Sequence, residues 1–378
     1  MKHKDEKGVE VVKRRTERTG MTSRRNMLTR SIALLALLGG SLGGVIAGGS
    51  GASAASKGSL HIYAWAGEVP ATMVKAFEKA TGITVTVDTA TSNEAMLAKI
   101  AAGNSGYDVV EPSQYAVQEL KQQKLIVPIS HAKLVGFSDE GTPYQSPSYD
   151  TGDKYSLPWL TGSTGLIYNS TCTGGPVNSW SVLWNPAFTG KLYVLDNELS
   201  AYITGLQYLG FKASSTNKAE IAQATAALVA QKPLLAGYNS TNSAQLVASG
   251  QACAAEVYSG GTTAAAVATN PSVVHYILPH AGGTIWVDSW SIVKGSKNVS
   301  NAYKWLNFAL QPKNAASAAI SAQEATTNHA AYKYIPAKDL NNSAIYTPLA
   351  SAATADFILD PGSALTYFNS GWLQVQAG

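Results

Sequence analysis

The sequence predicts an α/β fold in which a largely parallel sheet is flanked by helices. Stretches of alternating β-branched or aromatic residues at 60–65 and 83–89 are typical of strands. Between and after them, residues 71–81 and 92–103 repeat apolar side chains at helical spacing, and a glycine ends each pattern. Because strands and helices alternate with short links, we expect a sheet with helices on its faces.

Two loops of this first unit follow directly on strands. The strand at 60–65 ends at Trp65 and breaks at Gly67, before a helix that opens after Pro70. A third strand, at 107–110, leads into Glu111-Pro112-Ser113, ahead of a helix at 115–123. Ligands of open α/β sheets lie at the carboxyl ends of the strands, so both loops are candidate binding positions.

A second α/β unit is predicted beyond a surface stretch at 131–153, which is rich in Ser, Pro, Gly and Tyr. Extended segments at 155–159 and 165–168 surround the small-residue tract 161–164. The elements expected after it are a short helix at 181–188, strands at 192–195, 252–258, 273–278 and 282–293, and helices at 198–209, 218–231, 243–249, 301–310 and 312–321.

Residues 1–54 have the order of an export signal: a basic region, a short apolar run at 32–38, and small residues at a cleavage site. The Arg24-Arg25 pair before that run resembles a twin-arginine signal, with an ordinary secretory signal as the alternative. The run is too short for a membrane anchor, and no lipid-anchor cysteine follows it. We therefore expect a protein exported to the periplasmic space, the cell envelope or the exterior.

Removing that segment changes the charge of the chain. It holds ten of the 28 Lys and Arg and four of the 24 Asp and Glu, which leaves 18 against 20 and a net charge of −2. No basic patch then indicates nucleic acid as a partner. Charged residues make up only 14% of the sequence, which indicates an uncharged polar surface.

The cysteines and histidines indicate a disulfide or a metal site only weakly. Outside the cytoplasm a disulfide between Cys172 and Cys253 is allowed, and two buried free thiols are the alternative. His275 and His280 flank a strand-like stretch at a spacing that matches no common metal site. We expect neither a metal nor a cofactor.

A series of motifs, taken in order, carries a family resemblance. It includes LHIYAWAGEVP at 60–70, YDVVEPSQY at 107–115, YSLPWLTGSTGLIYN at 155–169 and GGTIWVDSWSIV at 282–293. In this order and spacing the chain resembles the spermidine/putrescine-binding proteins of bacterial ABC importers. Those are type II periplasmic binding proteins, in which two α/β lobes close on a ligand, and the match covers nearly the whole chain after the signal.

The resemblance implies an architecture and a role. Hinge crossings are expected after about Thr164, near Trp286 and late in the chain. One lobe would comprise 58–164 plus 287–332, and the other 165–286 plus 333–378, with the ligand cleft between them. The implied role is that of a monomeric binding component, not an enzyme, which passes a small cationic amine to permease subunits of an ABC transporter.

The resemblance places Trp65, Ser113, Tyr115, Trp286 and Asp288 at family ligand-contact positions. An ammonium group needs a carboxylate for its charge, and aromatic faces attract its positive charge and cover its methylenes. Asp288 would supply the first, and the aromatic rings the second. The alternatives are core packing for the two tryptophans and a local cap or turn for the aspartate.

This chain departs from the family pattern where the other carboxylates are expected. Gly67 replaces an acid, and Glu68 takes the next, usually aromatic, position. Asn197 and Ser200 stand where the family has two acids, with Asp196 and Glu198 to either side. The usual tryptophan is Tyr258, and an aromatic position is Glu324. Glu68 and Glu324 either restore negative charge or are surface bystanders. We expect a ligand with one cationic end near Asp288 and a polar end at Asn197 and Ser200.

The residues leave three alternative functions. For an extracellular hydrolase, the part after the signal lacks G-x-S-x-G and the whole chain lacks H-E-x-x-H, although a carboxylate-pair glycosidase leaves no fixed spacing. A metal-capturing protein would depend on His275 and His280. A sensor or adhesin built on the same clamp fold has no distinguishing motif.

Overall fold

The computed structural model describes residues 58–280, 282–347 and 355–378, so the predicted export signal lies outside the described residues. The strands are β1 (Ser59–Trp65), β2 (Thr84–Ala90), β3 (Val109–Val110), β4 (Leu157–Asn169), β5 (Leu192–Val194), β6 (Gly237–Tyr238), β7 (Ala254–Tyr258), β8 (Val274–Ile277), β9 (Thr284–Ile292), β10 (Ala325–Thr326) and β11 (Asp356–Phe357). The helices are α1 (Ala71–Thr81), α2 (Asn93–Ala101), α3 (Gln114–Gln122), α4 (Ser170–Thr173), α5 (Glu198–Tyr208), α6 (Lys218–Gln231), α7 (Ser243–Ala248), α8 (Gly261–Thr269), α9 (Val299–Ala309), α10 (Pro312–Ala322), α11 (Ala337–Leu340) and α13 (Leu365–Ala377).

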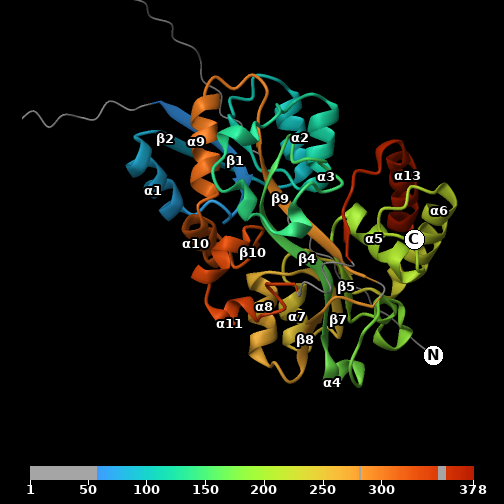
Figure 1. Ribbon diagram of the computed structural model, residues 1–378. Helices are drawn as coiled ribbons and strands as arrows, with labels where there is room; N and C mark the ends of the chain where they lie inside the picture. The colour runs from blue at the N-terminus through green and yellow to red at the C-terminus, as the bar shows by residue number, and fades with distance from the viewer. Residues whose placement is uncertain (1–57, 281, 348–354) are drawn as a thin grey trace, which may run out of the picture. The chain divides into compact units, whose positions relative to one another are not determined.

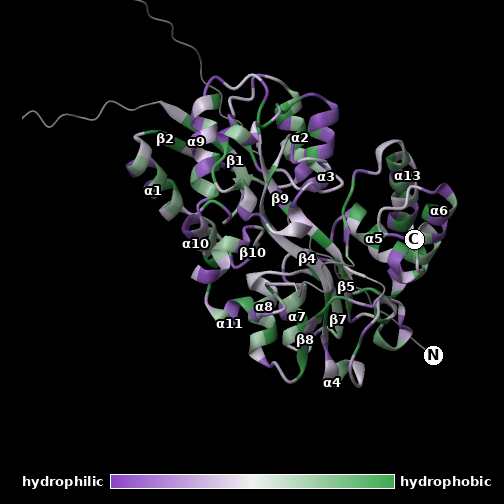
Figure 2. Cartoon of the chain, in the orientation of Figure 1, coloured by the Kyte–Doolittle hydropathy of each residue, from purple (hydrophilic) through white to green (hydrophobic). Residues whose placement is uncertain are grey.

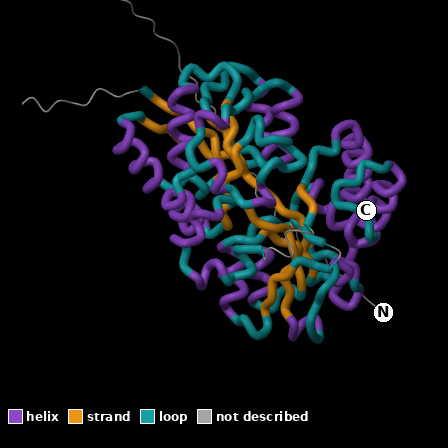
Figure 3. The backbone as a smooth tube through the Cα atoms, in the orientation of Figure 1, coloured by secondary structure: helices purple, strands orange, loops and turns teal. Residues whose placement is uncertain are grey.

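The strands join into one mixed sheet, with the order β2-β1-β3-β9-β4-β7-β5-β6 along its main path. Its flanks are parallel, as expected for α/β units: β1 pairs with β2 and β3, and β5 pairs with β6 and β7. Its centre is antiparallel, because β9 runs against both β3 and β4. Figure 3 shows the strands as a continuous band with helices along both sides. The α/β class is confirmed, and the largely parallel sheet holds for the flanks only.

β4 corrects one expectation from the sequence. Residues 155–168 were expected as two extended segments around a small-residue tract, but β4 is a single strand of 13 residues that is buried throughout. It pairs with β9 over its first half and with β7 and β8 over its second. The tract therefore continues the strand, because small side chains let neighbouring elements approach it closely.

The helices form as their sequences predict where caps are strong. α1 ends at Gly82, which adopts the left-handed conformation at φ 72°, and its buried face carries Met73 and Phe77. The Ser92 side chain accepts a hydrogen bond from the Ala95 amide and so caps α2. Figure 2 shows hydrophobic and hydrophilic residues side by side along these helices, as expected of helices that cover a sheet with one face.

Other elements differ from the sequence expectation. The helix expected at 181–188 is two 3₁₀ turns, Trp180–Trp184 and Pro186–Phe188, because Pro186 interrupts the helical hydrogen bonding. Four helices, α4, α8, α11 and α13, were not expected. No helix among the described residues has the length and apolar character needed to span a bilayer.

The buried apolar side chains follow the long strands. The largest cluster extends along β4 from Leu157 to Ile167 and includes Trp290 and Trp305. A second cluster lies beneath α5, α6 and α13, which lie together in Figure 1. β4 and β9 thus pair at the centre of the sheet, and the division into lobes at the expected boundaries stays a prediction.

Candidate functional site

A cavity of about 410 Å³ opens at the carboxyl ends of β1, β3, β5 and β7, beside β9. Every residue expected to contact the ligand lines it: Trp65, Glu68, Ser113, Tyr115, Asn197, Ser200, Tyr258, Trp286, Asp288 and Glu324. They come from strands, loops and the helices α3 and α5, between β1 and the residue before β10. The structure therefore brings the predicted residues together, and their contact with a ligand stays a prediction.

Trp65 and Trp286 differ from the other tryptophans near the sheet. Trp180, Trp290 and Trp305 are fully buried, whereas the two cavity tryptophans are only partly buried. Trp65 closes β1, and its backbone amide donates to Glu111 Oε2 at 3.0 Å. Core packing alone does not describe the two cavity tryptophans, because each presents part of its surface to the cavity.

Gly162 in β4 makes room for the Trp286 ring. A Cβ atom at this position would lie 2.2 Å from Trp286 Cζ2 and 2.5 Å from Ser259 Oγ. Trp286 lies opposite Gly162 in the β4–β9 pairing, so any side chain there would meet the indole directly. The small-residue tract thus serves the site as the surface against which one cavity tryptophan packs.

Asp288 lies within β9 and is only 6% exposed, so the local cap or turn alternative is wrong. Its Oδ1 accepts a 2.5 Å hydrogen bond from Ser113 Oγ. Asn93 holds Ser113 in place through two 3.0 Å bonds, one to its amide and one to its hydroxyl. Burial raises the pKa of Asp288 to about 7, while the Ser113 hydrogen bond and the neighbouring Trp65 side chain act in the opposite direction.

Glu68 and Glu324 are two further acids near Asp288. Glu68 is only 5% exposed, so it is not a surface bystander. Burial, followed by repulsion from Asp288, raises the pKa of Glu324 to about 8. Burial also raises the pKa of Glu68 well above its usual range, and the charges of Glu111, Asp288 and Glu324 raise it further.

Glu111 was not expected to contribute to the site. It lies directly after β3, is fully buried, and stands behind the cavity wall rather than lining it. Its pKa is raised well above the usual range by burial, and then by the charge of Asp288. The available signal was its position: an acid immediately after a buried strand, in a loop already marked as a candidate binding position.

The opposite wall is polar and mostly uncharged. Asn197 caps α5, because its side chain accepts a 2.9 Å hydrogen bond from the Ser200 amide. Asp196 lines the cavity from an exposed position, whereas Glu198 is not among the lining residues. The cavity therefore has its buried acids on one side and an amide and hydroxyls on the other.

Tyr115 and Tyr258 complete the aromatic lining. The Tyr115 hydroxyl donates a 2.9 Å hydrogen bond to Glu94 Oε1, and Glu94 also lines the cavity. Tyr258 ends β7 and is 38% exposed, so its ring forms part of the open rim. Five acids therefore line the cavity, and the described lining contains no lysine, arginine or histidine.

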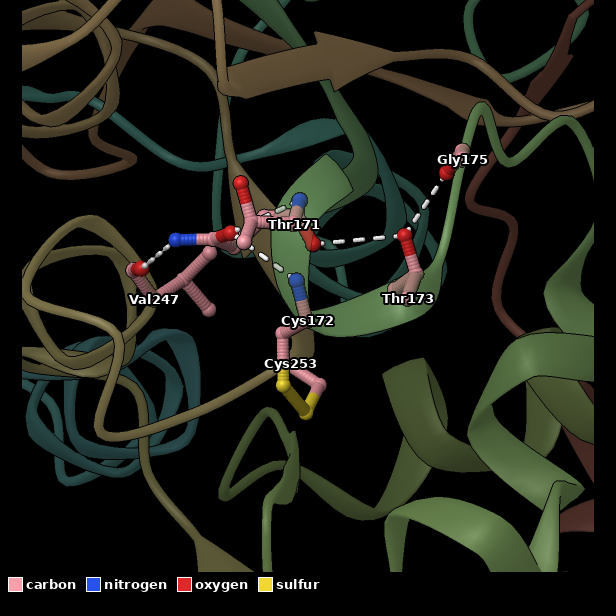
Figure 4. The surroundings of a disulfide bond; sticks show 7 residues. Thr171, Cys172, Thr173, Gly175, Val247 and Cys253 are labelled. Carbon is pink, nitrogen blue, oxygen red and sulfur yellow. Dashed lines mark hydrogen bonds between the residues drawn. A yellow bond between two sulfur atoms is a disulfide. The ribbon is translucent and has the colours of Figure 1, made fainter.

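The structure pairs Cys172 with Cys253, so the free-thiol alternative is wrong (Figure 4). The bond joins α4, at the end of β4, to the residue before β7, and the backbone amide of Asn169 also donates to the Cys253 carbonyl at 2.9 Å. His275 and His280 belong to no metal cluster: among residues 58–280, 282–347 and 355–378, no group of three or more His, Cys, Asp or Glu side chains is arranged to hold an ion.

Comparison with known proteins finds relatives that are named as solute-binding proteins. The family model described as bacterial extracellular solute-binding protein matches residues 72–347. The spermidine/putrescine-binding periplasmic protein of Escherichia coli is 30% identical over 89% of this chain and 97% of the relative. The putrescine/cadaverine-binding protein of Pseudomonas aeruginosa is 30% identical over 84% of this chain and 93% of the relative.

Solved structures agree with the sequence matches. A spermidine/putrescine ABC transporter protein from Listeria monocytogenes superposes with a TM-score of 0.76 at 30% identity, over 84% of this chain and 98% of that one. The substrate-binding protein of a spermidine/putrescine ABC transporter from Streptococcus pneumoniae gives 0.75 at 25% identity, with the same coverage. The two-lobe type II binding-protein fold expected from the sequence is thereby confirmed.

Proposed function

This chain belongs to the bacterial extracellular solute-binding proteins, and we propose that it captures a small cationic amine outside the cytoplasm for an ABC importer. The relatives are named as binding proteins for spermidine, putrescine or cadaverine, not as enzymes, so a hydrolase is not favoured. The ligand class proposed for this chain is a diamine or polyamine. ABC permease subunits would be its partners, and the protein would act as a monomer.

One observation carries the proposal: the charged side chains among the described residues of the cavity lining are all acidic. Aliphatic ammonium groups are positively charged at neutral pH and gain from both carboxylates and aromatic faces. Trp65 and Trp286 supply such faces. Each ring contributes roughly 0.5–2 kcal/mol to binding, depending on how completely water is excluded from the site. A cavity of this lining disfavours anionic ligands.

The uneven placement of the acids suggests how the amine lies. Its principal cationic end would meet Asp288, with Glu68 and Glu324 nearby, between the two tryptophans. Its other end would reach the side of Asn197 and Ser200, where the side chains offer polar atoms but no buried charge.

Closure would complete the site. In the proposed mechanism the lobes, 58–164 plus 287–332 and 165–286 plus 333–378, close on the ligand, as is usual for hinged binding proteins. The strands β4 and β9 are continuous across the proposed crossings, at Thr164 and at Trp286, and would act as the hinge. Export by the twin-arginine route through residues 1–54 completes the proposal.

A thermal-shift and calorimetry panel tests the function directly. Putrescine, cadaverine and spermidine should raise the melting temperature, with about 2.7 kcal/mol of added stability at a ligand concentration of 100 times Kd. Amino acids and betaines serve as the comparison classes. Asp288→Asn should weaken binding by 2–5 kcal/mol, about 30-fold or more, because it removes one partner of a buried charge pair.

Glu140→Gln is the matched control, since Glu140 is also a buried acid but does not line the cavity. It should leave the affinity unchanged. An absence of any shift or heat with every amine would overturn the proposed ligand class.

A further inference from the structure

The pair formed by Glu68 and Glu111 lies at the edge of the cavity and is not explained by charge complementarity alone. Glu68 comes from the loop after β1 and lines the cavity, whereas Glu111 comes from the loop after β3 and stands behind it. Both side chains are buried, and burial raises the pKa of each carboxyl group well above its usual range. Two buried carboxyl groups whose negative charges repel do not both ionise, so one of them holds a proton.

Glu68 is the member that holds the proton. Glu111 already accepts the backbone amide of Trp65 at 3.0 Å, which favours its ionised, accepting form. Glu68 is therefore the group that keeps its proton, and its Oε2 has no hydrogen-bond partner among the described residues. The proton thus resides on the carboxyl group that the ligand would meet first.

The surroundings keep the proton in place when the cavity is empty. Burial raises the pKa values of Glu68 and Glu111, and Asp288 on β9 and Glu324 ahead of β10 raise them further. Glu94 and Asp196 add negative charge at exposed positions of the lining. No basic side chain is present in the described lining to compensate. A cation is therefore the missing partner.

We infer that binding of a cationic ligand displaces the proton held by Glu68, so that ammonium capture is coupled to proton release. This inference rests on the proposed function. The ligand ammonium enters with its charge unchanged, Glu68 loses its proton to solvent, and the resulting carboxylate accepts a hydrogen bond from the ammonium. Glu111 is then a positioning residue, since it sets the protonation state of Glu68 without touching the ligand.

The direction of the pH dependence follows from the pKa of Glu68 in the empty and in the occupied cavity. In the empty cavity the pKa of Glu68 is raised, and a bound cation lowers it, because opposite charge favours the ionised form. Aliphatic ammonium groups titrate near pH 10, so the ligand itself keeps its charge below pH 8. Affinity should therefore increase with pH, by about tenfold per pH unit for each proton released, until Glu68 is ionised in the empty protein.

Calorimetry measures the released protons. The purified protein is titrated with putrescine at pH 7 in phosphate and in Tris, two buffers whose ionisation enthalpies differ strongly. The difference in observed heat gives the number of protons released per ligand. We expect Glu68→Gln to release fewer protons than the wild type by up to one, and its Kd to vary less with pH.

Glu111→Gln separates coupling from simple structural damage. Removing its negative charge should lower the pKa of Glu68, so the steep part of the Kd–pH profile should move to lower pH. A merely structural role would weaken binding equally at every pH. Glu140→Gln, the buried acid outside the cavity, should reproduce the wild-type profile. Should Glu68→Gln fail to fold, the shift in Glu111→Gln alone decides the question.

The experiment distinguishes a failure of the proton coupling from a failure of the proposed function. Measurable putrescine binding with equal proton release in the wild type and Glu68→Gln, or an unshifted profile in Glu111→Gln, overturns the coupling and leaves the proposed function standing. No heat with putrescine, cadaverine or spermidine in either buffer overturns the proposed function itself.

Discussion

Gly162→Ala should weaken amine binding by displacing the Trp286 ring. The added methyl group would lie 2.2 Å from Trp286 Cζ2, where an ordinary contact needs at least 3.4 Å, so the ring has to move by about 1.2 Å. Overpacking of this kind typically costs 1–3 kcal/mol of folding stability. If the ring can no longer face the ligand, the lost aromatic contribution of 0.5–2 kcal/mol corresponds to a rise in Kd of about 2- to 30-fold.

Gly165→Ala provides the matched control on the same strand. Its added methyl group would lie 2.5 Å from the Ile277 carbonyl oxygen and 2.7 Å from the Tyr276 hydroxyl, which is a comparable clash away from the cavity lining. Both variants should melt earlier than the wild type, but only Gly162→Ala should bind putrescine more weakly by calorimetry. A folded Gly162→Ala protein with wild-type affinity would show that the Trp286 position does not matter for binding.

Three further predictions concern the second tryptophan, the disulfide and a buried acid. Trp65→Ala should raise the Kd for amines by about 2- to 30-fold with a modest loss of stability, whereas unfolding with unchanged affinity would mean that the ring serves packing. Reducing Cys172–Cys253, which closes a loop of 81 residues, should lower the free energy of unfolding in urea by up to about 4.5 kcal/mol and leave binding intact; an unchanged midpoint would contradict this. Burial raises the pKa of Glu140 to about 8, so its neutral form stabilises the fold below about pH 4.5, and that contribution is lost as the pH rises through 8. The melting temperature of Glu140→Gln relative to the wild type should therefore increase from pH 5 to pH 9, and a constant difference would refute the shift.

Local signals were sufficient where one short segment determines its own structure. The bounds of α1 and α6 match the expected 71–81 and 218–231. In α1 the reason is the left-handed Gly82 at its end, and in α6 it is the Asn217 side chain, which accepts from the Ala219 amide at its start. These signals lie within a few residues of the feature that they predict.

Elements that depend on distant neighbours were missed or divided. The tract at 161–164 lacks large side chains, so its sequence indicates a break, yet the pairing of β4 with β9 on one side and β7 on the other extends the strand through it. α8 is rich in alanine and threonine and has no clear apolar stripe, so periodicity gives no helix signal there. Long-range pairing decides these regions.

The same distinction holds for the site. Trp65 and Ser113 could be placed from their positions at strand ends, and the residues on β9 from the family resemblance. The role of Glu111 could not be predicted, because it depends on the influence of its charge on Glu68, 43 positions earlier, and on the burial of both. Burial of an acid is visible only once the strands around it have been assembled.

The substitutions that seemed to remove negative charge from this chain move it instead. Gly67, Asn197 and Ser200 lack the acids of the family pattern, but Glu68 and Glu324 add carboxyl groups on the side of Asp288. Like charges buried together cannot all ionise, so the empty cavity holds less charge than its acids could supply. If binding is coupled to proton release as inferred, each ammonium group that enters would let a further carboxyl group ionise. The affinity should therefore depend on where the charges of an amine lie, and two ammonium groups close together near Asp288 gain more than the same two at opposite ends of the cavity.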